Sequence, residues 1–324
     1  MTYPIPPGTR DVLPDEMREL RALLEGLRTS FEQAGFGEVL TPTVEYEEVL
    51  RQGDERAAGA GYRLFDDHGR LLVLRSDMTI PIARMVSTRM ADHEGPLRLC
   101  YFGHAYRSVL RGSGRSTEFL QAGAELIGVP GAEGDAEIVG LVLDGLEAVG
   151  LRRHRVGIGD GDLYRRLLHA LEVPAEQGDE LLACLGRRDL AGVDARVRMA
   201  NLPEALVAIP SLRGGPEVLD RAEEMVGEVG ASALLELRGL HEALSQAGRA
   251  ERVIFDLGLV HELGYYTGAV FEIYDPAVGF ALGGGGRYDQ LLGRFGKPRP
   301  ACGIALDVQR VHEALAAEEG PADG

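Results

Sequence analysis

Apolar residues recur along the chain with two different spacings. Intervals of three and four residues predict amphipathic helices, which we place at residues 16–34, 79–89, 135–148 and 307–316. Short runs rich in apolar and β-branched residues predict strands, which we place at residues 36–43, 63–66, 71–75, 97–106, 117–127, 155–159 and 301–306. Both kinds of element alternate through most of the chain, so the pattern predicts a mixed α and β fold.

The pattern becomes almost wholly helical between residues 163 and 245. Leucine- and alanine-rich runs are interrupted there by Pro174, Pro203 and Pro210. At 324 residues the chain is also longer than a usual single domain. We therefore expect a helical insertion, residues 166–248, between two parts of one core, residues 1–165 and 249–324.

The stretch at residues 253–274 combines two apolar segments with a polar break. The run 253–259 reaches a turn-like sequence at 261–264 and resumes as an aromatic-rich segment, which predicts a hairpin of two strands. Side chains alternate between the faces of a strand, so one of Tyr265 and Tyr266 would line a pocket while the other packs behind it. A hairpin whose tyrosines only fill the core is the simpler interpretation of this stretch alone.

Residues 283–286 are four consecutive glycines, followed by Arg287, Tyr288 and Asp289. Glycine in a strand weakens it, so such a run needs a reason. The run indicates either a bulged or sharply bent strand, or the close approach of another group to the main chain.

The predicted loop at residues 108–116 is rich in glycine, serine and arginine. It contains Arg111 and Arg115 and directly follows Arg107. Such a loop is commonly a solvated hairpin tip. The alternative is an anion clamp, because guanidinium groups bind phosphate in a bidentate manner.

Composition narrows the class of protein. A hydrophobic fraction of 45% predicts a substantial core, and a net charge of −17 argues against a broad nucleic-acid-binding surface. Three widely spaced cysteines fit neither a disulfide framework nor a metal site. No apolar run is long enough to span a bilayer and the first residues lack a signal-peptide pattern, so we expect a cytoplasmic protein with no membrane partner.

Several motifs together resemble the catalytic core of histidyl-tRNA synthetase, a class II aminoacyl-tRNA synthetase. They are PPGTRDVLPDE at 6–16, the second-motif segment at 106–128 with Phe119 in register, LGYYTGAVFE at 263–272, GGGRYD at 284–289 and the third-motif segment at 301–311. The resemblance covers nearly the whole chain. It implies an α+β fold in which helices flank an antiparallel sheet, with a helical insertion and dimerisation through the first motif.

The resemblance also implies a histidine pocket. Six residues stand where that family binds the amino acid: Asp77, Gln121, Glu125, Tyr265, Tyr266 and Tyr288. Carboxylates and phenols supply the acceptors and donors that an ammonium group and an imidazole require. Three arginines stand on the nucleotide side and face an anion or are vestigial: Arg107, Arg115 and Arg310.

Three departures from the synthetase pattern affect ATP chemistry. His261 replaces an arginine that contacts the reacting carboxylate, and a histidine lacks the permanent bidentate charge of a guanidinium. Val109 replaces a glutamate that holds the ATP amino group, and Asp307 places a negative charge where a glycine leaves room for the nucleotide. We therefore expect no catalytic residues, no cofactor and no metal.

These departures, the acidity and the expected lack of an anticodon-binding domain make the chain resemble the regulatory paralogues of the synthetases, the ATP phosphoribosyltransferase regulatory subunits. The resemblance implies a non-catalytic role in the first step of histidine biosynthesis. The implied partners are the short catalytic subunit, in a hetero-octamer, and a second copy of this chain in a homodimer. Histidine is the implied feedback effector, and tRNA is not a partner.

Two alternatives stay open. A stand-alone enzyme could adenylate histidine while Arg107, Arg115 and Arg310 grip ATP. A scaffold with a vestigial pocket would bind neither ligand.

Overall fold

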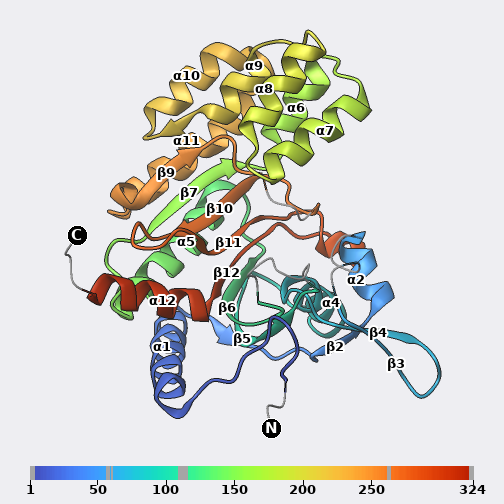
Figure 1. The fold of residues 1–324 in the computed structure, drawn as a ribbon, viewed down its shortest axis with the longest axis vertical. Helices are drawn as coiled ribbons and strands as arrows, with labels where there is room; N and C mark the ends of the chain where they lie inside the picture. Colours follow the sequence, from blue (N-terminus) through green and yellow to red (C-terminus); the bar gives the residue numbers. More distant parts are fainter. Residues whose placement is uncertain (1–3, 56–58, 60, 109–115, 261–263, 321–324) are drawn as a thin grey trace.

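The central element is a large mixed sheet. The computed structural model describes residues 4–55, 59, 61–108, 116–260 and 264–320. Within these residues, nine strands form the sheet in the order β1-β5-β6-β12-β11-β10-β7-β9-β8 (Figure 1). The strands are β1 (Gly37–Glu38), β5 (Leu97–Tyr106), β6 (Glu118–Ile127), β7 (Arg155–Asp160), β8 (Arg213–Gly214), β9 (Val253–Asp256), β10 (Ala269–Tyr274), β11 (Ala281–Arg287) and β12 (Ala301–Asp307).

Neighbouring strands run antiparallel except for two parallel pairs, β1 with β5 and β7 with β9. This arrangement confirms the α+β class with a mostly antiparallel sheet.

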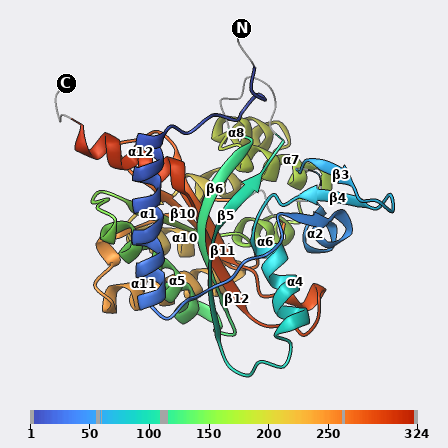
Figure 2. The same ribbon diagram turned by 90° about the horizontal axis from the view of Figure 1, so that it is seen from below.

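Helices α1 (Pro14–Gln33), α5 (Gly131–Ala148), α11 (Ala231–Gln246) and α12 (Val308–Glu319) cover one face of this sheet (Figure 2). Their apolar spacing explains the packing. In α1, for example, Leu20, Leu23, Leu27 and Phe31 recur at three- and four-residue intervals and are all buried. We call this side the helical face.

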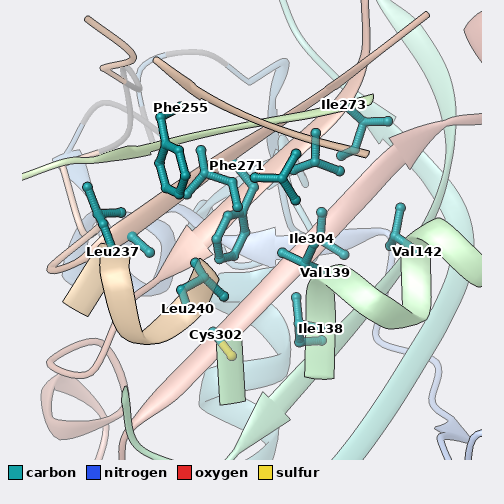
Figure 3. Close-up of a cluster of buried hydrophobic side chains, with 14 of the residues drawn as sticks. Ile138, Val139, Val142, Leu237, Leu240, Phe255, Phe271, Ile273, Cys302 and Ile304 are labelled. Carbon is teal, nitrogen blue, oxygen red and sulfur yellow. The ribbon is translucent and has the colours of Figure 1, made fainter. Parts of the chain in front are cut away.

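The main core lies between these helices and alternate residues of the strands. Figure 3 shows Ile138 and Val142 of α5 and Leu240 of α11 facing Phe271 of β10 and Ile304 of β12. Successive side chains of a strand alternate between faces. The residues between the core positions therefore point to the opposite side of the sheet, which we call the pocket face.

The pocket face is covered by α2 (Glu47–Gly53), α4 (Thr79–Arg89) and a small sheet (Figure 2). The small sheet has the order β2-β4-β3, with β2 (Val44–Tyr46), β3 (Arg63–Phe65) and β4 (Leu71–Leu74). Leu50, Val73 and Ile80 join Tyr101 of β5 in a second buried cluster on this side. The predicted hairpin 63–75 and the bounds predicted for the helix at 79–89 are confirmed.

The chain between β7 and β9 is helical, as predicted. Its elements are α6 (Leu163–Ala170), α7 (Ala175–Gly186), α8 (Leu190–Met199), α9 (Ala205–Ala208), α10 (Glu217–Val226), α11 and the 3₁₀ turns η1 (Ile209–Ser211) and η2 (Gly227–Val229). This segment also contributes β8 to the sheet edge, and Leu237 and Leu240 of α11 belong to the main core. The boundaries 1–165, 166–248 and 249–324 stay predictions.

Two strand predictions were wrong. Residues 253–274 do not form a hairpin, because β7 lies between β9 and β10 in the sheet. The strand predicted at 36–43 is reduced to β1, and after it the carbonyls of Thr41 and Pro42 accept hydrogen bonds from the buried guanidinium of Arg75. These carbonyls therefore bond to a side chain and not to a neighbouring strand.

The glycine run lies in β11, and the pairing of β11 with β10 shifts register at its start, where Leu282 is skipped between Ala281 and Gly283. Gly283, Gly284, Gly285 and Gly286 pair in continuous register with β12. A Cβ atom on Gly285 would lie 2.0 Å from the carbonyl oxygen of Gly303, and one on Gly283 would lie 2.1 Å from that of Ala305. The group that approaches the glycine main chain closely is therefore the main chain of the neighbouring strand β12.

The remaining short elements are the 3₁₀ turns η3 (Ala250–Arg252) and η4 (Leu292–Arg294). All three cysteines are buried free thiols, as expected. Among the described residues, no helix has the length and apolar character needed to cross a membrane.

Candidate functional site

Glu125 is the centre of a polar pocket on the pocket face. It lies on β6 and is only 1% exposed. The Thr79 hydroxyl donates to its Oε1 atom at 2.7 Å, and the Tyr288 hydroxyl donates to Oε2. Burial raises the pKa of Glu125 to about 8, even though both hydrogen bonds favour the charged form.

Asp77 places a second buried carboxyl group near Glu125. It precedes the first turn of α4, where its Oδ1 atom accepts from the backbone N–H of Ile80 at 2.9 Å. Burial raises its pKa, and the nearby charge of Arg107 partly offsets that effect. Burial raises the pKa of Tyr265, and the charges of Asp77 and Glu125 raise it further.

Two buried acceptor atoms in this pocket have no hydrogen-bond donor among the described residues. They are Oδ2 of Asp77 and Oε1 of Gln121, which lies on the same face of β6 as Glu125. Buried polar atoms are nearly always paired, and leaving one unpaired costs about 1–3 kcal/mol. A small ligand with N–H donors would satisfy both atoms.

Three tyrosines enclose these polar groups. The ring of Tyr265 lies 4.8 Å from that of Tyr266 and meets the ring of Tyr288 edge-on at 5.8 Å, measured between centroids. The expectation that Tyr265 and Tyr266 point to opposite faces was wrong. Both residues precede β10 and belong to no strand, so the strand alternation does not apply to them.

Glycines provide the room for these side chains. A Cβ atom on Gly303 would lie 1.7 Å from Oε2 of Glu125, and one on Gly286 would lie 2.8 Å from the ring of Tyr266. Gly123 stands likewise opposite Tyr101, whose hydroxyl would be 2.4 Å from an added Cβ. The floor of the pocket is therefore backbone, over which the carboxylate and the phenols extend.

The two described arginines of the expected anion site are engaged within the chain. Arg107 donates from Nε to the carbonyl of Ser76 at 3.3 Å and lies over the Phe119 ring at 5.1 Å. Arg310 donates from Nη1 to the carbonyl of Ala281 at 2.7 Å, and its Nε atom lies 3.4 Å from Oδ2 of Asp307.

Asp307 is also the N-cap of α12, since its side chain accepts from the backbone N–H of Arg310 at 3.2 Å. The aspartate therefore serves both the helix and the arginine. Its negative charge offsets the positive charge of Arg310.

Three of the residues singled out in the sequence, Val109, Arg115 and His261, lie outside the described residues. Of the six histidine-pocket candidates, the structure brings Asp77, Tyr265, Tyr266 and Tyr288 together around Glu125, and Gln121 lies on the same face of β6. Within the described part of the chain, no group of three or more His, Cys, Asp or Glu side chains could hold a metal ion.

Sequence reasoning missed three contributors to the pocket. Thr79 stands two residues after Asp77, at the first position of a helix, where its hydroxyl could have been expected near that carboxylate. Tyr101 alternates with buried core residues of β5 and had no distinguishing signal. Gly303 is a single glycine in an apolar strand, which by itself suggests a close approach.

Comparisons with known proteins identify the class of this fold. A family model described as histidyl-tRNA synthetase matches residues 8–311. A solved protein of Alicyclobacillus acidocaldarius, named as a histidine–tRNA ligase subunit, superposes with a TM-score of 0.87 and 33% identity, covering 99% of each chain. The fold is that of the class II aminoacyl-tRNA synthetases, of the histidyl-tRNA synthetase type.

More specific matches lie among regulatory proteins. The ATP phosphoribosyltransferase regulatory subunit of Desulforamulus reducens is 41% identical over 320 residues, covering 97% of this chain and 80% of that protein. A Bacillus halodurans structure, named as an ATP phosphoribosyltransferase regulatory subunit/histidyl-tRNA synthetase, superposes with a TM-score of 0.90 at 34% identity, covering 97% of this chain and 84% of its own. The chain belongs to the family of ATP phosphoribosyltransferase regulatory subunits, which confirms the resemblance found in the sequence.

Proposed function

We propose that this regulatory subunit binds histidine in the pocket around Glu125 and conveys feedback inhibition to a short-form ATP phosphoribosyltransferase catalytic subunit. The observation that carries the proposal is the pair of buried carboxyl groups, Glu125 and Asp77, with unpaired acceptors on Asp77 and Gln121. An ammonium group and an imidazole N–H supply the missing charge and donors.

The nucleotide side supports a role without ATP activation. Stabilising a developing phosphate charge requires cations that are free to face it. Arg310 is instead paired with Asp307 and bonded to the carbonyl of Ala281. Arg107 lies over the Phe119 ring, so this guanidinium is also engaged within the chain. With no catalytic chemistry of its own, the subunit acts on the first step of histidine biosynthesis through its partner, in the cytoplasm.

Regulation follows if histidine binds one state of the complex more tightly than the other. A ligand shifts a conformational equilibrium only by its difference in affinity for the two states. Histidine bound here favours the less active state of a hetero-octamer of regulatory and catalytic subunits. The acidic chain, with a net charge of −17, has no part in binding tRNA.

A second copy of this chain is the other proposed partner. The outer face of the small sheet is rich in apolar side chains, because Val44, Tyr46, Leu64, Leu72 and Leu74 share it by strand register, and Arg70 covers the ring of Tyr46. Val44 is 41% exposed and Leu64 is 42% exposed. Apolar faces of this kind mark protein interfaces, which supports a homodimer through this side of the core.

Isothermal titration of histidine into the reconstituted complex tests the pocket. We expect binding by the wild-type complex and at least a tenfold loss with Glu125→Ala, since removing a charged partner costs about 1.5–3 kcal/mol. Glu137→Ala is a matched control, because Glu137 lies on α5 and pairs with Arg98 away from the pocket. Equal binding by the Glu125→Ala and wild-type complexes would exclude this pocket.

ATP–pyrophosphate exchange separates the proposal from a histidine-adenylating enzyme. Such an enzyme must catalyse the exchange, whereas the regulatory subunit alone shows neither exchange nor phosphoribosyl transfer. Exchange by the purified chain that requires histidine would overturn the non-catalytic role.

A further inference from the structure

Asp54 connects the end of α2 to the segment that carries the pocket tyrosines. Its carboxylate accepts a hydrogen bond from the backbone N–H of Gly264 at 2.8 Å, across 210 positions of sequence. Asp54 is only 7% exposed, and Gly264 directly precedes Tyr265. A buried carboxylate is costly unless it is well bonded, so this contact needs a structural reason.

The position of Asp54 is fixed by the helix that it ends. It is the C-cap of α2, with an extended backbone, and its N–H donates to the carbonyl of Leu50 at 2.7 Å. Gly53, one residue earlier, is pressed against α4, since a Cβ atom there would lie 2.6 Å from the side chain of Ile80. The end of α2 is therefore held against the same turn of α4 that presents Asp77 and Thr79.

A second set of contacts holds the end of α2 from the other side. The Gln52 amide donates to the carbonyl of Arg294, and the Arg294 guanidinium donates to the carbonyl of Gly53. Arg294 ends η4, a few residues after Tyr288. The carboxylate of Asp54 thus projects from an anchored turn between two elements that flank the pocket.

The segment that begins at Gly264 is fixed at its other end by β11. The backbone N–H of Thr267 donates to the carbonyl of Arg287 at 2.8 Å, and the backbone N–H of Asp289 donates to the Thr267 hydroxyl at 3.0 Å. Tyr265 and Tyr266 lie between these two attachments. The hydrogen bond from Gly264 to Asp54 is the attachment at the amino-terminal end of this short segment.

We propose that Asp54 is a positioning residue for the pocket: by holding the N–H of Gly264 it sets the rings of Tyr265 and Tyr266 against Tyr288 and hence against Glu125. The hydrogen bond is charge-assisted, so it is short and directional enough to fix a backbone. Because α2 also packs beside the small sheet, Asp54 joins the proposed dimer side of the core to the ligand side. The titration that tests this role rests on the proposed histidine site, whereas the hydrogen-exchange measurement does not.

The test compares Asp54→Ala and Asp54→Asn in the reconstituted full-length complex, with histidine titration and amide hydrogen exchange as the two measurements. Loss of a charged acceptor costs about 1.5–3 kcal/mol, so Asp54→Ala should weaken histidine binding about tenfold or more. Asp54→Asn keeps an acceptor oxygen without the charge and should lose about threefold, the smaller effect of a neutral hydrogen bond.

Exchange should become faster at residues 264–267 in Asp54→Ala but not in α2 or α4, because Gln52 and Gly53 still hold the end of α2 against Arg294 and Ile80. A purely structural role would instead speed exchange throughout α2 and α4. Asp66→Ala is the matched control. Its carboxylate also holds backbone N–H groups, those of His68 and Arg70, but at the tip of the β3–β4 turn.

The proposal is overturned if Asp54→Ala binds histidine like the wild type and leaves exchange at 264–267 unchanged. If Asp54→Ala does not fold, Asp54→Asn decides on the same two measurements. If the wild type itself binds no histidine, the proposed function fails, and exchange alone tests the positioning role: acceleration confined to 264–267 supports it and unchanged exchange refutes it.

Discussion

Glu125 lowers the stability of the empty chain at neutral and alkaline pH. Its carboxyl group is buried, and two hydroxyl donors do not replace the water that it loses. A glutamine would carry no charge, and its carbonyl oxygen would accept from one of the two hydroxyls while its NH2 group donates to the other. Retaining a carboxylate in such a place is typical of a binding site, where function and stability conflict.

Glu125→Gln should therefore stabilise the chain in a pH-dependent manner. The pKa of Glu125 is raised from 4.5 to about 8, so between these values the folded state binds more protons and the free energy of unfolding falls as pH rises. Relative to wild type, the variant should gain about 4 kcal/mol more at pH ~8.5 than at pH ~5. Urea unfolding at both pH values measures the difference. Parallel curves for the two proteins would contradict the buried-charge account.

Histidine binding should release protons. Near pH 7 the raised pKa keeps most of Glu125 protonated in the empty pocket, whereas a bound ammonium group favours the carboxylate. Titration in phosphate and in Tris should then give enthalpies that differ by the buffers' ionisation enthalpies, for up to about one proton released per site. Above pH ~9 the difference should vanish for this group. Enthalpies that do not depend on the buffer near pH 7 would show that Glu125 keeps one protonation state.

At the scale of strands and helices, the pocket depends on where side chains are missing. Gly303 on β12 stands directly opposite Glu125 on β6, and Gly286 on β11 stands below Tyr266. A side chain at either position would fill the space that the carboxylate or the phenol occupies. The strands thus contribute as much through their glycines as through their polar residues.

Gly303→Ala should remove histidine binding and destabilise the fold. The added Cβ would lie 1.7 Å from Oε2 of Glu125, so the carboxylate must leave its place between Thr79 and Tyr288. Overpacking of this kind costs about 1–3 kcal/mol. Thermal unfolding and histidine titration check the two effects. Gly37→Ala, in β1 of the same sheet, is the control, because its added Cβ would meet only the carbonyl oxygen of Arg98 at 3.9 Å.

Elements encoded by local spacing could be predicted from the sequence, whereas pairings between distant strands could not. The bounds of α4 and β5 coincide with those predicted, because apolar period and length define them locally. The hairpin at 253–274 was wrong because β7 pairs between the two segments, parallel to β9 and antiparallel to β10. The sequence of residues 253–274 gives no sign that a strand about 100 residues earlier will pair between them.

The candidate site followed from motifs and not from periodicity. Asp77, Gln121, Glu125 and the three tyrosines lie on the same side of the sheet, although they come from four separate segments of the chain. Asp54 and Thr79 were missed because their roles depend on contacts with Gly264 and Glu125 that only the folded chain brings about. Sequence spacing carries no record of such contacts.

At the scale of the whole molecule, the proposed ligand pocket and the proposed dimer surface lie on the same side of the large sheet. The inner face of the small sheet, with Val73, packs into the cluster that contains Tyr265 and Tyr288. Its outer face, with Val44 and Leu64, is exposed. A second copy docked there would press on the layer that covers the pocket, so dimerisation and histidine affinity should be linked.

The double variant Val44→Asp/Leu64→Asp should dissociate the homodimer. Two carboxylates in an apolar interface lose their hydration without gaining partners, which makes association unfavourable. Sedimentation velocity should show monomers for this variant and dimers for the wild type. Leu190→Asp/Met225→Asp is a matched control on the helical insertion, since these residues are 41% and 43% exposed and lie on α8 and α10. Dimers that persist in the first variant, or that the control alone disrupts, would place the interface elsewhere. If the linkage holds, the monomeric variant should also bind histidine with an altered affinity while Glu125 and its hydrogen bonds remain in place.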